Sequence, residues 1–264
     1  MTHRNLNGSS ITFPQDNNIH FEESDHTYTV DGVGNMTPVS SVISMFFTPF
    51  DTEYWSLRKC GGNEEKAEEL REKWKAKGIS ASQAGTHLHK QIETFLNTGK
   101  EADMICHIQF DGKYIHLQED IDISTEWKYF KNFHKNTRYT PFRTEWCVYD
   151  CSTRMAGTID LLCSCDDGTY EMYDWKRSCN INTHEENKWN HGCNGLEHLS
   201  DTAYSHYCLQ QNLYRYMLEK NYGLNISSMH LVVLHPEKKN FEIIKVKPLE
   251  KEVETIVSHL RQVI

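Results

Sequence analysis

The spacing of apolar and polar residues predicts a chain that begins with helices and continues with strands. Residues 26–30 are β-prone and precede an Asp31-Gly32 turn, which predicts a small N-terminal hairpin. Apolar residues then recur at helical spacing, and Leu70 and Trp74, four apart, mark an exposed amphipathic segment. The helices that this pattern predicts cover residues 37–47, 62–77, 80–99 and 121–135, with a hairpin-like or loop stretch at 110–115.

The period changes after residue 143, where three β-like runs follow one another. Turn residues separate them at Cys151-Ser152 and at Asp166-Asp167-Gly168. A polar segment without a period follows at 178–200, and Gly223 ends a long helix. The predicted strands are 144–149, 154–163, 169–175, 229–234 and 241–246, and the predicted helices of this half are 204–222 and 249–263.

This order of elements predicts an α/β protein with a central mixed β-sheet flanked by helices. A chain of 264 residues can bury a substantial core and needs no disulfides to fold. No internal repeat, low-complexity tract or long flexible linker interrupts it. We therefore expect a single domain over 1–264, with a hairpin and helices in 1–78 and a core in 79–264.

Composition narrows the possible environments and partners. No apolar run approaches the ~20 residues that span a bilayer, and the first 20 residues lack an apolar signal segment. We therefore expect an intracellular protein without a membrane partner, in the cytoplasm or in the nucleus of a eukaryotic host. The nine cysteines are odd in number and irregularly spaced, which predicts reduced thiols.

The formal net charge is −9, which argues against a simple nucleic-acid coating protein, because such proteins are usually basic. An enzyme that holds divalent cations is compatible with this charge, since it needs clustered carboxylates and can confine its basic residues to one groove.

Three charged residues end two neighbouring strands. Asp160 follows an apolar run, and Asp174 and Lys176, two apart on the next strand, project to one face. Two aspartates repel unless a cation lies between them, and hard oxygen ligands favour Mg²⁺ or Mn²⁺. A nearby lysine can orient the attacking water, so the set fits phosphodiester hydrolysis. The alternative is a surface hairpin with three unrelated charges, since lone D-x-K triplets are common.

Two helical pairs add to this set. His89 and Glu93 are four apart and share a helix face, where they can bind a metal or orient a ligand. Gln210 and Tyr214 also share a face and can contact a phosphate or brace the catalytic strand. The alternatives are a solvated histidine, a solvated glutamine and a tyrosine packed in the core.

The motifs G-T-x-x-H-x-x-x-E, G-T-I-D, D-x-K and Q-x-x-x-Y, in this order, resemble the RecB-type branch of the PD-(D/E)xK nucleases. That branch includes nuclease domains of recombination helicases, CRISPR-associated exonucleases and viral or phage alkaline exonucleases. The motifs cover residues 80–222. The resemblance implies a restriction-endonuclease-like core and a metal-dependent DNA nuclease, more specifically an exonuclease in DNA processing, repair or recombination.

The resemblance also implies a role for each matched residue. It implies Mg²⁺ or Mn²⁺ as the cofactor and DNA, as linear duplex or single strand, as the partner. The metal ligands would be His89, Asp160, Asp174 and the carbonyl of Trp175, and Lys176 would be the catalytic lysine. Gln210 and Tyr214 would belong to the motif on the helix behind the site. Glu93 matches the acidic residue of the helix motif, and Glu145 would lie near the site.

One feature departs from part of the family. Some relatives hold an iron–sulfur cluster with one cysteine before and three after the Q-x-x-x-Y helix. Here no cysteine follows Cys208, so we expect no such cluster. This absence favours the simpler exonucleases over the helicase-linked members.

The segment 179–198 leaves an alternative open. It holds residues that can bind zinc, although their spacing matches no compact Cys/His pattern. The simpler interpretation is a loop beside the active site, where Lys188 and Trp189 could contact DNA. Two rival functions remain: an inactive nuclease-fold binding module, and an interaction protein stabilised by zinc at this segment. The zinc-binding candidates are Cys179, His184, His191, Cys193 and His198.

Overall fold

A large mixed β-sheet with helices forms unit 1, one of two compact units into which the contacts of the chain divide. The computed structural model describes residues 5–179, 181, 187 and 190–263. Unit 1 comprises Met1–Thr48, Lys135–Val233 and Glu242–Ile264, and unit 2 comprises Pro49–His134 and Leu234–Phe241.

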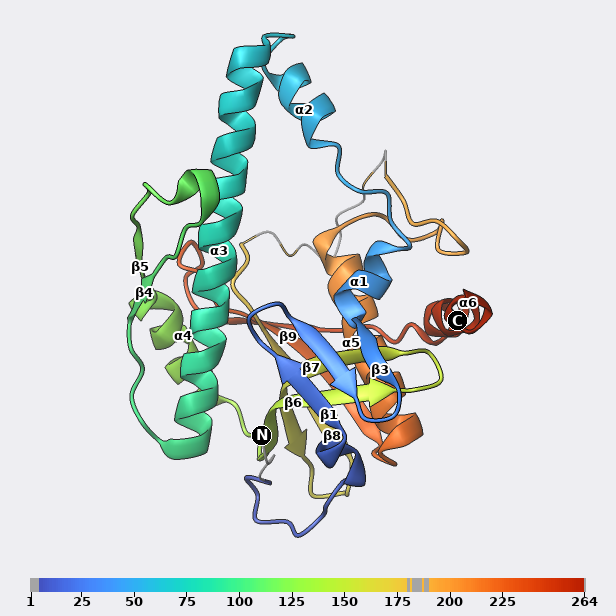
Figure 1. Cartoon of the computed structure of the whole chain (residues 1–264). Coiled ribbons are helices and arrows are strands. Elements are labelled where there is room, and N and C mark those ends of the chain that lie inside the picture. Colours follow the sequence, from blue (N-terminus) through green and yellow to red (C-terminus); the bar gives the residue numbers. More distant parts are fainter. Residues whose placement is uncertain (1–4, 180, 182–186, 188–189, 264) are drawn as a thin grey trace. The chain divides into compact units, whose positions relative to one another are not determined.

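The sheet of unit 1 follows the order β1-β2-β3-β7-β8-β9-β10, with β6 paired to β7 (Figure 1). β6, β7 and β8 are antiparallel neighbours, as the sequence predicts, whereas β8 and β9 are parallel. A parallel pair requires a long crossover connection, and α5 (Ala203–Asn221) lies in it. The strands are β1 (Ile19–Glu22), β2 (Thr27–Val30), β3 (Gly34–Pro38), β6 (Pro141–Asp150), β7 (Met155–Ser164), β8 (Tyr170–Lys176), β9 (Ile226–Val233) and β10 (Glu242–Lys245).

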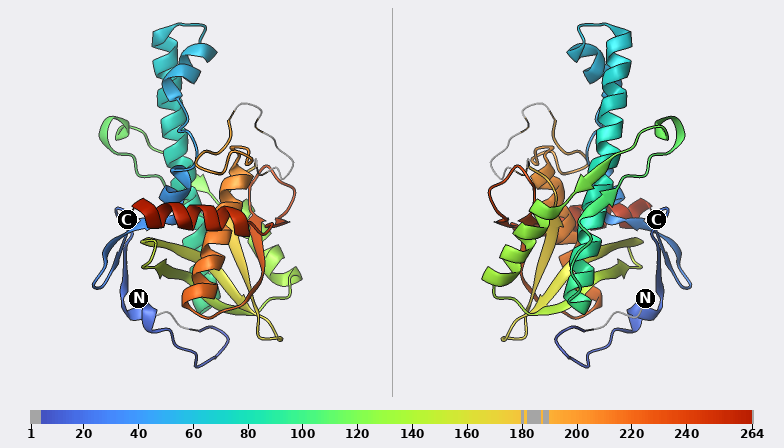
Figure 2. Two further views of the ribbon diagram at one scale, coloured as in Figure 1. Left: turned by 90° about the vertical axis from the view of Figure 1, so that its right-hand side faces the viewer. Right: turned by 90° about the vertical axis from the view of Figure 1, so that its left-hand side faces the viewer.

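Helices cover the sheet of unit 1. Figure 2 shows α5 and α6 (Glu250–Val263) on the same side of the sheet, with α6 crossing α5. Together with α1 (Val39–Ser44) they bury the larger hydrophobic cluster against the strands. A smaller cluster packs β1–β3 against β6 and β7, and the short 3₁₀ helix η1 (Pro14–Asn17) precedes these strands. The predicted mixed α/β architecture is thus confirmed.

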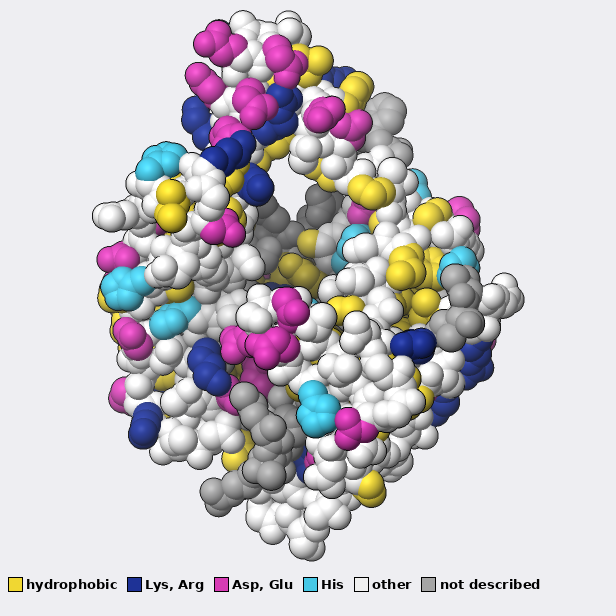
Figure 3. Space-filling model, in the orientation of Figure 1, with side chains coloured by type: hydrophobic (Ala, Val, Ile, Leu, Met, Phe, Trp, Pro, Cys, Tyr) yellow, Lys and Arg dark blue, Asp and Glu magenta, His cyan; other side chains and the backbone are white. Residues whose placement is uncertain are grey.

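Unit 2 is mainly helical. The C-terminal half of α3 packs on α4, where the Phe95 ring lies 5.5 Å from that of Trp127 and 5.8 Å from that of Phe130. The Tyr129 hydroxyl donates to the carbonyl of Lys238 at 2.6 Å. Charged side chains of both signs surround the end formed by α2 and the start of α3 (Figure 3). The elements are α2 (Thr52–Lys59), α3 (Glu64–Thr98), β4 (Ile105–His107), η2 (Gly112–Tyr114), β5 (Asp120–Asp122) and α4 (Ser124–Asn136), whose last two residues belong to unit 1.

The helices predicted at 62–77 and 80–99 are one continuous helix, α3, so the predicted break between two helices is wrong. Glycine in a helix interior is less favourable than alanine by about 1 kcal/mol. Because Gly78 keeps its backbone N–H group, it removes no hydrogen bond and the helix continues through it. Ser80 does not cap a new helix, because its hydroxyl donates to the Ala76 carbonyl at 3.2 Å, one turn back.

Two smaller differences concern unit 2. The sequence pattern did not predict α2, which Asp51 caps by accepting from the backbone nitrogen of Tyr54 at 2.8 Å. The hairpin expected around 110–115 has its strands further apart, at β4 and β5, and η2 lies between them.

The other predicted elements are present with shifted ends. All nine cysteines carry free thiols. Within the described part of the chain, no helix combines the length and apolarity that a membrane span requires.

Candidate active site

The candidate site lies along one edge of β7, at an opening where β7 pairs with neither β3 nor β8. β6 pairs with β7 along one edge, so β3 and β8 share the opposite edge. The ladder with β3 ends at Ala156, and the ladder with β8 begins at Leu161. Residues 157–160 lie between the two ladders, and Asp160 is the last of them before β8. The G-T-I-D motif therefore coincides with this opening.

Asp160 bridges the opening with its side chain. The next pair in the β7–β8 register would be Asp160 and Asp174, one step beyond Leu161 and Tyr173. Instead, Oδ2 of Asp160 accepts a hydrogen bond of 2.8 Å from the backbone nitrogen of Trp175. The residue is only 9% exposed. The bond fixes the Asp160 carboxylate beside the residue that follows Asp174, as the sequence argument requires.

Asp174 and Lys176 form a buried ion pair on β8. Nζ of Lys176 lies 2.6 Å from Oδ2 of Asp174, and Nε2 of Gln211 donates to Oδ1 at 2.9 Å. Burial by itself lowers the pKa of Lys176, but the charges of Asp174 and Asp160 outweigh it and raise the pKa above its usual value. Lys176 therefore carries its proton at neutral pH and acts as a cation.

One face of α5 holds this ion pair in place. Nζ of Lys176 donates to Oε1 of Gln210 at 3.2 Å, and Nε2 of Gln210 donates to the Tyr214 hydroxyl at 3.2 Å. The ammonium group also lies 4.4 Å from the centre of the Tyr207 ring. The structure thus brings Gln210 and Tyr214 together with the predicted lysine, and Gln210 is not simply solvated.

Gly157 allows Tyr214 to approach β7. A Cβ atom at Gly157 would lie 2.6 Å from Cε1 and 2.9 Å from the hydroxyl oxygen of Tyr214. The ring is buried, and burial raises the pKa of Tyr214 well above its usual value, so the phenol stays protonated. The glycine of the G-T-I-D motif is therefore required by close packing.

Glu145 adds a second carboxylate beside Asp160. It lies opposite Asp160 in the β6–β7 register, and the two side chains have carboxylate oxygens within 4.8 Å of each other. Its φ of 43° is in the left-handed region, which costs a residue other than glycine about 1–3 kcal/mol. Strained residues of this kind cluster at functional sites, so the geometry supports the predicted place of Glu145.

We expect Glu145→Gln to raise the melting temperature of the metal-free protein and to weaken its stabilisation by Mg²⁺. Removing one of two adjacent negative charges relieves a repulsion on the order of 1 kcal/mol or more. Such a gain corresponds to a rise of about 2–4 °C. Thermal unfolding with and without Mg²⁺ measures both effects.

Glu171→Gln on β8 is the matched control for Glu145→Gln. Glu171 accepts hydrogen bonds from Tyr173 and Ser228, each at 2.9 Å, so its loss should lower stability and leave the response to Mg²⁺ intact. A Glu145→Gln protein with the full Mg²⁺ response of the wild type would remove Glu145 from the metal site.

Two residues of this site, Gln211 and Tyr207, were not predicted from the sequence. Gln211 is 1% exposed and holds Asp174, and Tyr207 covers Lys176. Positions 207, 210, 211 and 214 follow the i, i+3, i+4, i+7 spacing of one helix face. That spacing is visible in the sequence and could have identified both residues.

Two further predicted residues, His89 and Glu93, lie on α3. His89 is half-buried on α3 of unit 2, and Glu93, one turn later, pairs with Lys90 at 2.9 Å. Their part in the site stays a prediction from the sequence. The same holds for the carbonyl of Trp175 as a metal ligand.

Two of the possible zinc ligands in 179–198 have other partners. Nε2 of His198 lies 2.8 Å from a carboxylate oxygen of Glu252, and the Cys193 thiol faces the carbonyl of Met45 at 3.8 Å. His184, Lys188 and Trp189 lie outside the described residues. The predicted contacts of this segment with zinc or DNA therefore stay predictions.

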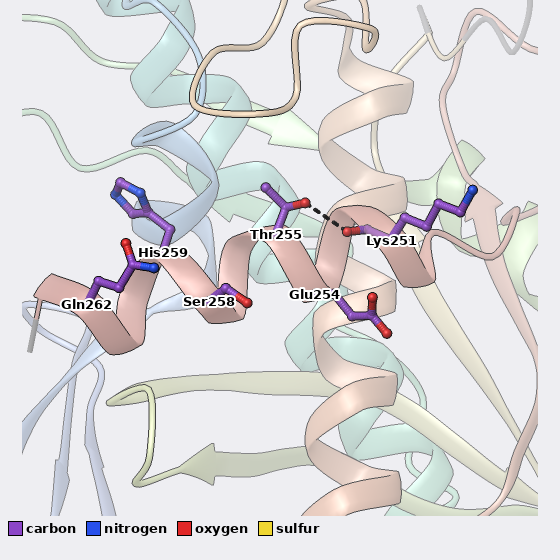
Figure 4. A pocket seen from close by; sticks show the side chains of 6 residues that line it. All are labelled: Lys251, Glu254, Thr255, Ser258, His259 and Gln262. Carbon is purple, nitrogen blue, oxygen red and sulfur yellow. Dashed lines mark hydrogen bonds between the residues drawn. The ribbon is translucent and has the colours of Figure 1, made fainter.

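A hollow of about 550 Å³ lies on the outer face of α6 (Figure 4). A single helix lines it, and Thr255 uses its hydroxyl to bond the Lys251 carbonyl of the same helix. It shares no residue with the cluster on β7, β8 and α5. The lining residues are Lys251, Glu254, Thr255, Ser258, His259 and Gln262.

No protein-family model matches the sequence, and no curated protein matches it. A solved structure titled "Crystal structure of SSO0001" is similar to this chain with a TM-score of 0.33 and 10% sequence identity. The similarity covers 86% of this chain and 74% of that chain. A similarity of this degree carries no argument about the site.

Proposed function

We propose that this chain is a metal-dependent nuclease that hydrolyses phosphodiester bonds in DNA. The observation that carries the proposal is the bond from the Trp175 nitrogen to Asp160, which fixes one buried carboxylate directly beside the Asp174–Lys176 pair. The order β6, β7, β8, crossover α5 and parallel β9 supports a restriction-endonuclease-like core around this site.

The residues of the site fit a divalent cation. Asp174 is 3% exposed and Asp160 9%, and Glu145 lies next to Asp160. The three carboxylates repel one another in a poorly solvated place, and a dication between them would offset that repulsion. All three offer hard oxygen atoms, which favour Mg²⁺ or Mn²⁺ over softer metals. Asp174, Asp160 and Glu145 would hold the ion.

The side chains of the site have separable roles in hydrolysis. A bound dication supplies Lewis acidity, which lowers the pKa of a water molecule and offsets charge on the phosphate. Lys176, kept protonated, offers its N–H groups to a phosphate oxygen or to the attacking water. Gln210 and Tyr207 restrict the ammonium group to one position, and Gln211 orients Asp174. Orientation by fixed neighbours is what makes such groups effective.

Cleavage of DNA substrates tests the proposal. We expect the purified protein to digest linear DNA with Mg²⁺ or Mn²⁺ and to be inactive with chelator, since the carboxylates need a dication to approach a phosphate. Degradation of linear but not circular duplex would establish an exonuclease, and nicking of the circle an endonuclease. Parallel reactions with single-stranded DNA and with RNA define the substrate class.

Two results would contradict the nuclease proposal. Mg²⁺ binding and DNA binding without cleavage would identify an inactive nuclease-fold binding module. Stoichiometric zinc in the purified protein, with no cleavage in Mg²⁺, would favour the zinc-stabilised interaction protein. Participation in DNA processing, repair or recombination inside a cell belongs to the same proposal.

A further inference from the structure

An exposed group of aromatic rings lies at the α2–α3 end of unit 2, outside the residues that the proposed chemistry uses. Phe50 is 61% exposed and Tyr54 is 52% exposed. The Phe50 ring lies 6.4 Å from that of Trp55, nearly parallel to it, and 6.0 Å from that of Trp74. Tyr54 contacts Trp55 edge-on at 5.2 Å. We call Phe50, Tyr54, Trp55 and Trp74 the aromatic surface. Exposed apolar groups of this kind mark binding sites.

Two cations border the aromatic surface. The Arg58 guanidinium lies 5.3 Å from the centre of the Trp55 ring and donates to the Tyr54 hydroxyl at 3.0 Å. Nζ of Lys59 lies 5.4 Å from the centre of the Trp74 ring. Within the described ranges neither cation has a carboxylate within ion-pair distance, whereas Arg71, on α3, pairs with Glu64 and Glu68. The charge beside the rings is therefore available to an anionic ligand.

We infer that the aromatic surface binds single-stranded DNA, with bases stacked on Phe50 and Tyr54 and phosphates near Arg58 and Lys59. A single strand offers a flat ring and a negative charge in every nucleotide, which matches rings bordered by cations. In a duplex the base faces are already stacked on one another and cannot cover these rings. The choice of DNA among anionic polymers rests on the proposed nuclease function.

Binding without cleavage tests this inference. The full chain is mixed with fluorescein-labelled oligo(dT) in the presence of chelator, and fluorescence anisotropy gives the affinity. We expect Phe50→Ala and Tyr54→Ala each to weaken binding by about fivefold or more, the loss of one stacked base. We expect Arg58→Gln to reduce the slope of log affinity against log salt by about 0.7, the loss of one phosphate contact.

Phe21→Ala is the matched control, because Phe21 is also an exposed aromatic residue, at 36%, but lies on β1 of unit 1. It should leave the affinity unchanged, and circular dichroism should show that every variant folds. Wild-type affinity in the Phe50→Ala/Tyr54→Ala protein would overturn the inference. So would tighter binding of labelled duplex than of oligo(dT), or a wild-type dimer that these substitutions dissociate without affecting DNA binding.

The test separates this inference from the proposed function, because it requires no hydrolysis. Loss of oligo(dT) binding in the two aromatic variants, in a protein that never cleaves DNA, would support the aromatic surface and remove the nuclease. Cleavage in Mg²⁺ together with unchanged binding in these variants would keep the nuclease and remove the aromatic surface.

Discussion

Asp174→Asn should reduce Mg²⁺-dependent cleavage of linear DNA by about a thousandfold. Asparagine keeps the size of the side chain but removes the charge that would hold a dication and that now lies 2.6 Å from Lys176. The loss of one group that stabilises a transition state commonly costs about 10²–10³ in kcat. Rates of DNA digestion at saturating Mg²⁺, corrected for the folded fraction, measure the effect.

Asp174→Asn should also destabilise the fold, because it leaves the ammonium group of Lys176 buried without its nearest counter-charge. Breaking a buried pair on one side costs about 3–5 kcal/mol. The double variant Asp174→Asn/Lys176→Met removes both charges and should recover most of that stability while remaining inactive. Denaturant unfolding of both proteins therefore separates the energetic role of the pair from its chemical role.

Asp150→Asn is the matched control. Asp150 is also 3% exposed, lies on the same sheet and pairs with a lysine, Lys220, at 3.0 Å. It accepts from the hydroxyls of Ser152 and Thr153 in the β6–β7 turn, outside the candidate site. Its substitution should lower stability but leave cleavage per folded molecule intact. Equal loss of cleavage in the Asp150 and Asp174 variants would show that the effect is structural, and the metal site would lose its support.

The juxtaposition of Asp160 with β8 was predictable because it is local. One tight turn at residues 165–169 joins β7 to β8, so the register of a hairpin brings Asp160 near Asp174. The alternation of side chains along β8 then places Asp174 and Lys176 on one face. These two relations need only strand period and turn chemistry, both of which are written in a short stretch of sequence.

The opening in the β7 ladder was not predictable, because it depends on a distant strand. β3 pairs in parallel with Met155 and Ala156, more than a hundred residues later in the chain, and no local pattern encodes that register. Gln211 is a different case, because positions 207, 210, 211 and 214 share one helix face and the prediction used only Gln210 and Tyr214 of that face. The continuity of α3 through Gly78 was also not predictable, because a lone glycine in a helical pattern permits both a break and a continuous helix.

Gly157→Ala should lower both stability and activity, because the added methyl group would collide with the ring of Tyr214. The added methyl group would lie 2.6 Å from Cε1 of Tyr214, and the ring is buried between β7 and α5. Overpacking of this kind costs about 1–3 kcal/mol, more than alanine gains over glycine in the unfolded chain. If the ring moves instead, the hydrogen bonds from Lys176 through Gln210 to Tyr214 shift with it. Denaturant unfolding and the rate of DNA cleavage measure the two consequences.

The order of contacts at Gly157 makes that prediction specific. Gly157→Ala/Tyr214→Phe should stay destabilised, because the closest atom is Cε1 and phenylalanine keeps it. Gly157→Ala/Tyr214→Leu should recover stability without recovering cleavage, since leucine relieves the crowding but gives Gln210 no hydroxyl to bind. Gly78→Ala, where no atom lies within 4 Å of the added Cβ, should be neutral or stabilising by up to about 1 kcal/mol. A Gly157→Ala protein as stable and active as the wild type would mean that Tyr214 does not pack on this strand, and the brace between α5 and Lys176 would have to be abandoned.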